Sequence, residues 1–157
     1  MRKFLVSAAT VVAALTTLSV TPSAQATEIG YEGCTPGYWK NHTDNWQEMK
    51  SERLFGVVYT SAPTSVSGLT FLQALQARGG AGADGAAQIL ARASAAAYLN
   101  AAHEGLGYPW RRLTTGKDDR PALVATVNAA FASGDRDTML ALAARLDADN
   151  NLGCPLS

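Results

Sequence analysis

The sequence predicts an all-α fold, a compact domain of four to five helices with an irregular aromatic N-terminal segment and one closing disulfide. Three observations lead to this prediction. Apolar residues recur every three to four positions through most of residues 70–150, which is the period of an amphipathic helix. Acidic residues or a threonine precede these segments and glycines follow them, as expected for helix ends. Two cysteines stand near the two ends of the predicted domain.

The first 26 residues have the parts of a secretory signal peptide. Arg2 and Lys3 form a short positive start, residues 4–20 are mostly apolar, and residues 24–26, Ala-Gln-Ala, match a small-x-small cleavage site. We predict cleavage after Ala26. The alternative is a retained membrane anchor, but serines and threonines interrupt the apolar run, which is short for a span of ~20 apolar residues.

Cleavage would leave a single domain at residues 27–157, secreted or held in the periplasm. The chain has 13 basic and 13 acidic residues, and cleavage removes two basic ones, so the remaining domain would carry 11 against 13, a net charge of −2. This balance gives no general attraction to nucleic acid or to an anionic membrane, and we expect neither as a partner. A charged fraction of 17% with an ordinary apolar fraction also excludes a disordered polyampholyte.

Cys34 and Cys154 are the only cysteines, and we predict that they form one disulfide, as is usual for an exported chain. The bond would close a loop of roughly 120 residues and stabilise the domain by about 4–5 kcal/mol on the chain-entropy model. The alternatives are two free thiols or half of a zinc site. A zinc site needs about four ligands, and the chain offers only His42 and His103 as further histidines.

The first part of the predicted domain carries little helical periodicity. Residues 27–48 are rich in aromatic and turn-forming residues, and most of this segment is expected to be irregular. A short helix is predicted over residues 44–53. Residues 54–59, Leu-Phe-Gly-Val-Val-Tyr, predict a short strand, and residues 60–69 are expected to form a loop because they are rich in serine, threonine and proline.

Helical patterning dominates after this loop. Thr70 is the predicted cap of a short helix that ends at Gly79-Gly80. Asp84 is the predicted cap of a long helix over residues 85–103. The apolar positions of this long helix cover a wide arc and are mostly alanine, so we expect it to lie at the centre of the domain with closely packed neighbours.

Two further helices complete the predicted fold. The first begins at the acidic pair 118–119 and closes at Gly134. The second begins at Asp135 or Asp137 and unwinds at residues 150–153.

The run Cys-Thr-Pro-Gly-Tyr-Trp-Lys-Asn-His at residues 34–42 resembles the opening motif of a family of bacterial exported proteins. The similarity continues through Trp46, residues 95–102, the Tyr-Pro pair 108–109, and residues 150–156. Members of that family are mostly described as hypothetical secreted proteins or as modules in larger surface proteins. The resemblance therefore implies export and folding as a unit, and it supplies no catalytic residues.

The leading functional hypothesis is a non-enzymatic binding or structural protein of the cell exterior that recognises a surface glycan or a protein partner. Flat aromatic rings beside amide donors suit sugar binding, since a pyranose face stacks on a ring while its hydroxyls are hydrogen-bonded. The alternative role is structural, with the tryptophans packed against the helices. The candidate binding residues are Tyr38, Trp39, Lys40, Asn41, His42 and Trp110.

The alternative functional class is a small secreted enzyme or metal-dependent module that uses His42 and neighbouring polar groups. Nucleophilic hydrolysis needs a serine or cysteine beside a histidine, but the chain has no Gly-x-Ser-x-Gly motif and its cysteines are expected to pair. His103 ends the long predicted helix, where a capping or half-buried role is expected. The sequence therefore favours no catalytic residue, no metal and no cofactor.

Two charged stretches also suggest ligands. Residues 147–153 place oxygen-bearing side chains at alternate positions, as calcium loops do, but Leu152 stands where such loops have glycine. We therefore predict a helix end there. The second stretch contains the basic residues Arg111, Arg112, Lys117 and Arg120, which could bind an acidic glycan. The acidic pair 118–119 lies among them and partly cancels their charge, so we expect an ordinary solvated loop.

Overall fold

The computed structural model of this chain describes residues 30–111 and 118–156. The predicted signal peptide at residues 1–26, as well as Arg112 and Lys117, lies outside these described residues. Within them the predicted all-α class is confirmed: the structure contains α-helices, one short 3-10 helix and two isolated β-bridges, and no longer strand. Among the described residues, no helix is both long and apolar enough to cross a membrane.

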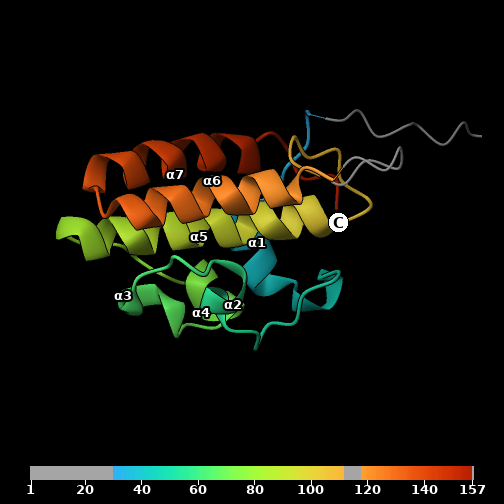
Figure 1. Cartoon of the computed structure of the whole chain (residues 1–157). Coiled ribbons are helices and arrows are strands. Elements are labelled where there is room, and N and C mark those ends of the chain that lie inside the picture. Colours follow the sequence, from blue (N-terminus) through green and yellow to red (C-terminus); the bar gives the residue numbers. More distant parts are fainter. Residues whose placement is uncertain (1–29, 112–117, 157) are drawn as a thin grey trace, which may run out of the picture.

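In the described part of the chain, two long helices lie on one side of the long helix α5 and four short helices lie on the other (Figure 1). The long ones are α5 (Gly82–Ala102), α6 (Arg120–Ser133) and α7 (Arg136–Asn150), and α6 and α7 lie together on one side of α5. The opposite side is covered by the short helices, which are α1 (Pro36–Asn41), α2 (Phe55–Val58), α3 (Thr64–Ser67) and α4 (Phe71–Leu75).

Helix α5 is central because its sequence lets several other helices pack closely against it. Of its 21 residues, 14 are buried, and most of the buried ones are alanine. It contacts α1, α3, α4, α6 and α7. The predicted central helix is therefore confirmed, but its cap is not Asp84: the helix begins at Gly82, and Asp84 lies in its first turn, where a carboxylate suits the helix dipole.

The boundaries of the other predicted helices are largely confirmed by their caps. The Thr70 hydroxyl accepts the Gln73 N–H in a full capping box at the start of α4, although α4 ends before the predicted glycine pair. Helix α6 closes at Gly134, which has a left-handed φ of 63°. At the start of α7, the Asp135 carboxylate accepts the Thr138 N–H at 2.7 Å.

The predicted helix over residues 44–53 is wrong. The helix in this part of the chain is α1, which begins earlier, and a 3-10 helix at Thr43–Asn45 follows it. Thr35 and Pro36 explain the difference. The Thr35 hydroxyl accepts the Tyr38 N–H at 3.1 Å, and Pro36 at the first helical position needs no hydrogen-bond partner for its nitrogen.

The predicted strand over residues 54–59 and the predicted loop over residues 60–69 are also wrong in part. The first segment forms α2 and the second contains α3. Helical geometry places Phe55 and Tyr59 on one side of α2, where both rings are fully buried. Among the described residues the number of helices therefore exceeds the predicted four to five, because the sequence did not predict α1, α2 and α3, which have only four to six residues.

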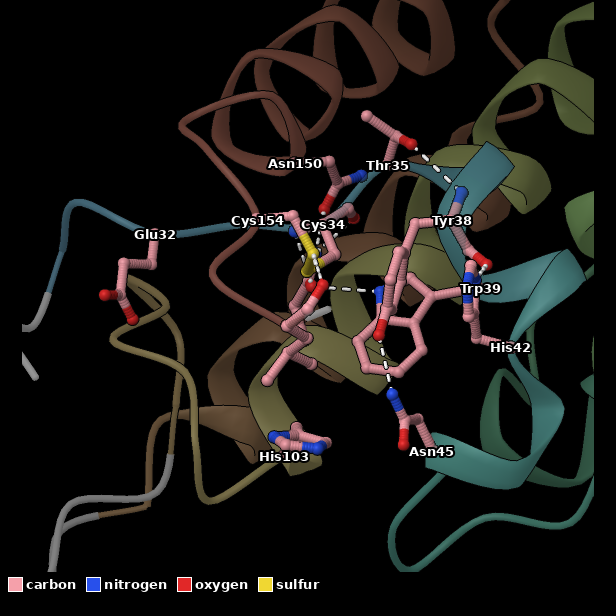
Figure 2. Close-up of a disulfide and its surroundings, with 12 residues drawn as sticks. Glu32, Cys34, Thr35, Tyr38, Trp39, His42, Asn45, His103, Asn150 and Cys154 are labelled. Carbon is pink, nitrogen blue, oxygen red and sulfur yellow. Dashed lines mark hydrogen bonds between the residues drawn. A yellow bond between two sulfur atoms is a disulfide. The ribbon is translucent and has the colours of Figure 1, made fainter.

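The N-terminal segment is attached to the helices by a buried network of amides (Figure 2). The Asn100 Oδ1 atom accepts the Cys34 N–H at 2.8 Å and the Trp39 indole N–H at 2.9 Å. The Asn100 amide nitrogen donates to the Cys34 carbonyl and to Asn150 Oδ1, both at 2.9 Å. This side chain on α5 thereby uses its full hydrogen-bonding capacity while fully buried.

Asn150 extends the same network to α7. Its Oδ1 atom also accepts the Tyr108 hydroxyl at 2.9 Å, and its amide nitrogen donates to the Ala93 carbonyl at 3.0 Å. The network thus joins the N-terminal segment, α5, α7 and the chain that follows α5. A buried polar network of this kind fixes one arrangement of these segments, because any shift would leave buried groups unsatisfied.

The predicted disulfide between Cys34 and Cys154 is confirmed. Cys34 is fully buried and is already held by Asn100, whereas Cys154 lies at the surface. An antiparallel bridge between Gly33 and Gly153 supports the bond, with the Gly33 N–H donating to the Gly153 carbonyl at 2.9 Å. Gly33 is required for space, since a Cβ atom there would lie 2.1 Å from the Asp149 carbonyl oxygen.

Replacing Asn100 with leucine tests the network. The variant leaves the Cys34 N–H, the Cys34 carbonyl and the Trp39 indole N–H without their partner in the core. Each unsatisfied group costs about 1–3 kcal/mol, so we expect the free energy of unfolding to fall by ~3 kcal/mol or more. The measurement is chemical denaturation of the oxidised protein.

Asn41→Leu is the matched control, because Asn41 is exposed and its side chain has no hydrogen-bond partner among the described residues. This variant should change the unfolding free energy by no more than about 0.5 kcal/mol. Equal effects of the two substitutions would contradict the assigned role of Asn100.

Candidate functional site

The predicted aromatic platform is mostly a structural unit (Figure 2). Trp39 is fully buried and donates to Asn100, so it has no free ring face for a ligand and its predicted binding role is wrong. Trp46 is partly buried, and its indole N–H donates to the Trp39 carbonyl at 3.0 Å. Both tryptophans therefore hold the N-terminal segment against the core. This is the structural role that the sequence predicts as the alternative to sugar binding.

The rings of Tyr38 and His42 stack on each other, so each covers one face of the other. Their rings stack with centroids 4.2 Å apart and an interplanar angle of 11°. The His42 Nδ1–H donates to the Tyr38 carbonyl at 2.9 Å, and the Tyr38 hydroxyl accepts the Asn45 amide at 2.6 Å. These contacts are local, and they stabilise the end of α1. Among the described residues, no group of three or more His, Cys, Asp or Glu side chains lies close enough to hold a metal ion.

The structure does not bring the six predicted binding residues together. Asn41 is exposed beside Tyr38 and His42. Lys40, also exposed, lines a polar cleft of about 610 Å³ between α1, α4, α5 and α7. Trp110 lines a different pocket, beside α6 and α7.

The Trp110 pocket has a volume of about 310 Å³, and its lining combines one aromatic ring with charged groups. The indole N–H donates to the Asp149 carboxylate at 3.2 Å, and the Arg145 guanidinium lies 5.2 Å from the ring centroid. Asp119, at the start of α6, is a second carboxylate in the lining. The predicted binding role of Trp110 thus has a concave site around it, whereas the contributions of Arg145 and Asp149 were not foreseen from the sequence.

The side chains of residues 147–153 do not converge on a common point, as the ligands of a calcium loop would. Asp149 binds Trp110, Asp147 lines the cleft that contains Lys40, and Asn150 is buried in the amide network. Helix α7 ends here as expected, with Gly153 at a positive φ of 125°. The predicted helix end is therefore the better interpretation of this segment.

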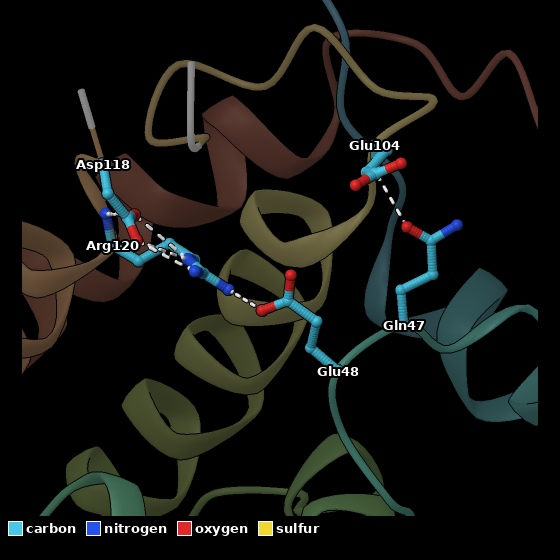
Figure 3. A network of polar contacts seen from close by, with 5 residues as sticks. All are labelled: Gln47, Glu48, Glu104, Asp118 and Arg120. Carbon is cyan, nitrogen blue, oxygen red and sulfur yellow. Dashed lines mark hydrogen bonds and ion pairs between the residues drawn. The ribbon is translucent and has the colours of Figure 1, made fainter. Parts of the chain in front are cut away.

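The two described arginines of the basic stretch, Arg111 and Arg120, are engaged within the protein, and Figure 3 shows the contacts of Arg120. Arg120 donates to both oxygens of Asp118, with its Nη2 atom 2.8 Å from Oδ2, and forms a second ion pair with Glu48. These hydrogen bonds to Asp118 and Glu48 raise the pKa of the Arg120 guanidinium further above its ordinary value. Arg111 donates to the Glu104 carbonyl at 3.0 Å. Neither arginine is therefore arranged to bind an acidic glycan.

Glu48 has the only positive φ among the described non-glycine residues, at 59°. A glutamate in this conformation is uncommon, and its ion pair with Arg120 ties the loop before α2 to the start of α6. Gln47 makes a second tie nearby, because its Oε1 atom accepts the Glu104 N–H at 2.8 Å (Figure 3). No sequence pattern identified this pair of contacts.

Comparison with known proteins adds no assignment: no family model, curated protein or solved structure matches this chain. The sequence resemblance to exported bacterial proteins therefore stays a prediction.

His103 predicts a pH dependence of stability. The residue is 9% exposed, and its Nδ1 atom accepts the Gly105 N–H at 3.0 Å, which requires an unprotonated Nδ1. Burial lowers the pKa of His103 below its ordinary value, and the positive charge of Arg111 lowers it further against the opposing effect of Glu104. The unfolded chain therefore takes up a proton at a higher pH than the folded protein does.

We expect stability to decline as the pH falls below about 6.5, the ordinary histidine pKa, toward the lower pKa of the folded state. His103→Asn offers an amide oxygen to the Gly105 N–H and has no titrating ring, so it should flatten this decline. Chemical denaturation at a series of pH values between about 5 and 8 measures it. The same slope in both proteins would show that His103 is not its source.

Proposed function

We propose that this protein is a non-enzymatic binding domain of the cell exterior that recognises a surface glycan through the Trp110 pocket. One observation carries the proposal: a half-buried indole ring stands in a pocket whose other lining residues include two carboxylates and a guanidinium. Sugar recognition needs this combination, since a pyranose presents apolar C–H groups on its face and hydroxyls around its edge.

Each charged group of the pocket has a role toward such a ligand. The carboxylates of Asp119 and Asp149 can accept hydrogen bonds from sugar hydroxyls, and the Arg145 guanidinium can donate to them. A pyranose would pack on the part of the indole that Arg145 leaves uncovered. The bond from the indole N–H to Asp149 holds the ring in place before binding, which lowers the entropy cost of association.

The export part of the proposal rests on chemistry outside the pocket. A disulfide persists in oxidising compartments, so the Cys34–Cys154 bond is consistent with a protein that works outside the cytoplasm. The signal-peptide pattern of residues 1–26 and the resemblance to exported bacterial proteins support the same location. The proposal assigns no catalytic residue, no metal and no cofactor.

The test is retention of the purified, oxidised protein by insoluble cell-wall polysaccharide, followed by competition with soluble oligosaccharides. Trp110→Ala removes the ring, and we expect it to lower the apparent affinity up to about ten-fold, since an aromatic contact contributes about 0.5–1.5 kcal/mol beyond the area that it buries. Arg145→Gln, at the exposed rim of the pocket, should also weaken retention.

Tyr31→Ala is the control, because Tyr31 is 69% exposed and lines neither concave site. It should bind like the wild type. Absence of retention by any polysaccharide, or full retention of both pocket variants, would overturn glycan recognition at Trp110 and favour a protein partner.

A further inference from the structure

A second concave site, here called the basic cleft, lies on the opposite flank of α7 from the Trp110 pocket. It measures about 610 Å³. Asp147 and Asn151 line the basic cleft, whereas Arg145 and Asp149 line the Trp110 pocket. Positions 147 and 149 are about 200° apart around a helix of 3.6 residues per turn, so the two sites face different directions. They share no lining residue.

Positive charge dominates the basic cleft. Lys40 from α1, Arg78 from the segment after α4 and Arg92 from α5 are its three cations, and Asp147 is its one carboxylate. None of these four side chains forms a hydrogen bond or ion pair with another residue in the part of the chain that the structure describes. The cleft therefore keeps a local excess of positive charge on a chain without net charge.

Arg92 is the residue that most needs a partner. It projects from the central helix and is half-buried. Two other arginines of the described chain are engaged: Arg120 with two carboxylates, and Arg136 with the Gly82 carbonyl at 2.5 Å. Partial burial of a cation costs free energy unless a hydrogen-bond acceptor or an opposite charge compensates, and a bound anion would provide both.

The remaining lining identifies the kind of anion. The polar groups of Gln76, Asp147 and Asn151 can exchange hydrogen bonds with hydroxyls, and the carboxylate of Asp147 would repel a bare polyanion. No aromatic residue lines the cleft, so it offers no ring on which a nucleobase could stack. The volume falls in the range of about 300–1,000 Å³ that is typical of small-molecule sites.

We propose that the basic cleft binds an anionic saccharide, a sugar unit that carries a carboxylate or a phosphate group. Arg92, Arg78 and Lys40 hold the charged group, and Asp147 accepts a hydrogen bond from a sugar hydroxyl. This site is independent of the glycan site proposed at Trp110, because either one can be removed without a change in the lining of the other.

Isothermal titration calorimetry of the oxidised protein at low ionic strength tests the proposal. The probes are glucuronate, glucose 6-phosphate, glucose and inorganic phosphate. We expect at least one of the two anionic sugars to bind, glucose to bind at least ten-fold more weakly, and added salt to weaken binding. Arg92→Gln should lower the affinity about ten- to hundred-fold, as expected for loss of a hydrogen bond to a charged group.

Three variants make the result specific. Arg53→Gln removes the same charge from an exposed arginine outside both sites and should bind within two-fold of the wild type. Lys40→Gln alters an exposed residue of the cleft and should weaken binding even if Arg92→Gln fails to fold. Trp110→Ala should leave this binding unchanged, which separates it from the proposed glycan site.

Several results would overturn the inference. These are absence of binding by both anionic sugars, wild-type affinity in both cleft variants, or equal losses in Arg53→Gln and Lys40→Gln. Inorganic phosphate that binds as tightly as glucose 6-phosphate would show an anion site without sugar recognition, and glucose that binds as tightly as the anionic sugars would show that charge is not what the cleft recognises.

Discussion

The fully buried amide of Asn100 is the interaction on which the rest of the structure depends. It binds both the N–H and the carbonyl of Cys34, so the N-terminal segment lies on α5 in a fixed register, before any contribution from the disulfide. The same amide binds the Trp39 indole and Asn150, which places α1 and the end of α7 relative to α5. The disulfide then joins two segments that the network has already brought together.

Both concave sites are built around this network. The basic cleft takes one wall from α1, whose position depends on Trp39, and another from the last turns of α7, whose position depends on Asn150. The Trp110 pocket uses the other flank of the same turns of α7. Tyr108, two residues before Trp110, also binds Asn150 and so fixes the chain that carries the indole. Rigid support of this kind favours binding, because the site loses little conformational entropy when a ligand binds.

The long helices could be predicted because their signals are local, and the disulfide could be predicted because the chain has only two cysteines. Helical periodicity, the caps at Thr70 and Asp135 and the stop at Gly134 each act within a few residues. The short helices could not, since a helix of four residues such as α2 is stable only through tertiary packing, here the burial of Phe55 and Tyr59. The two binding sites could not be predicted either, because the residues that line them come from segments far apart in the sequence. Trp39 was misassigned for the same reason: its partner is Asn100, 61 residues away.

Hydrogen exchange at the Cys34 amide, compared between the oxidised and the reduced protein, tests the central role of the network most directly. This N–H donates to Asn100 at 2.8 Å and has no covalent dependence on the disulfide. If the network holds the N-terminal segment, the Cys34 amide should stay protected after reduction, with exchange about a hundred-fold or more slower than in an unstructured peptide. Exchange at the unstructured rate in a reduced protein whose α5 amides remain protected would contradict this account and assign the docking to the disulfide alone.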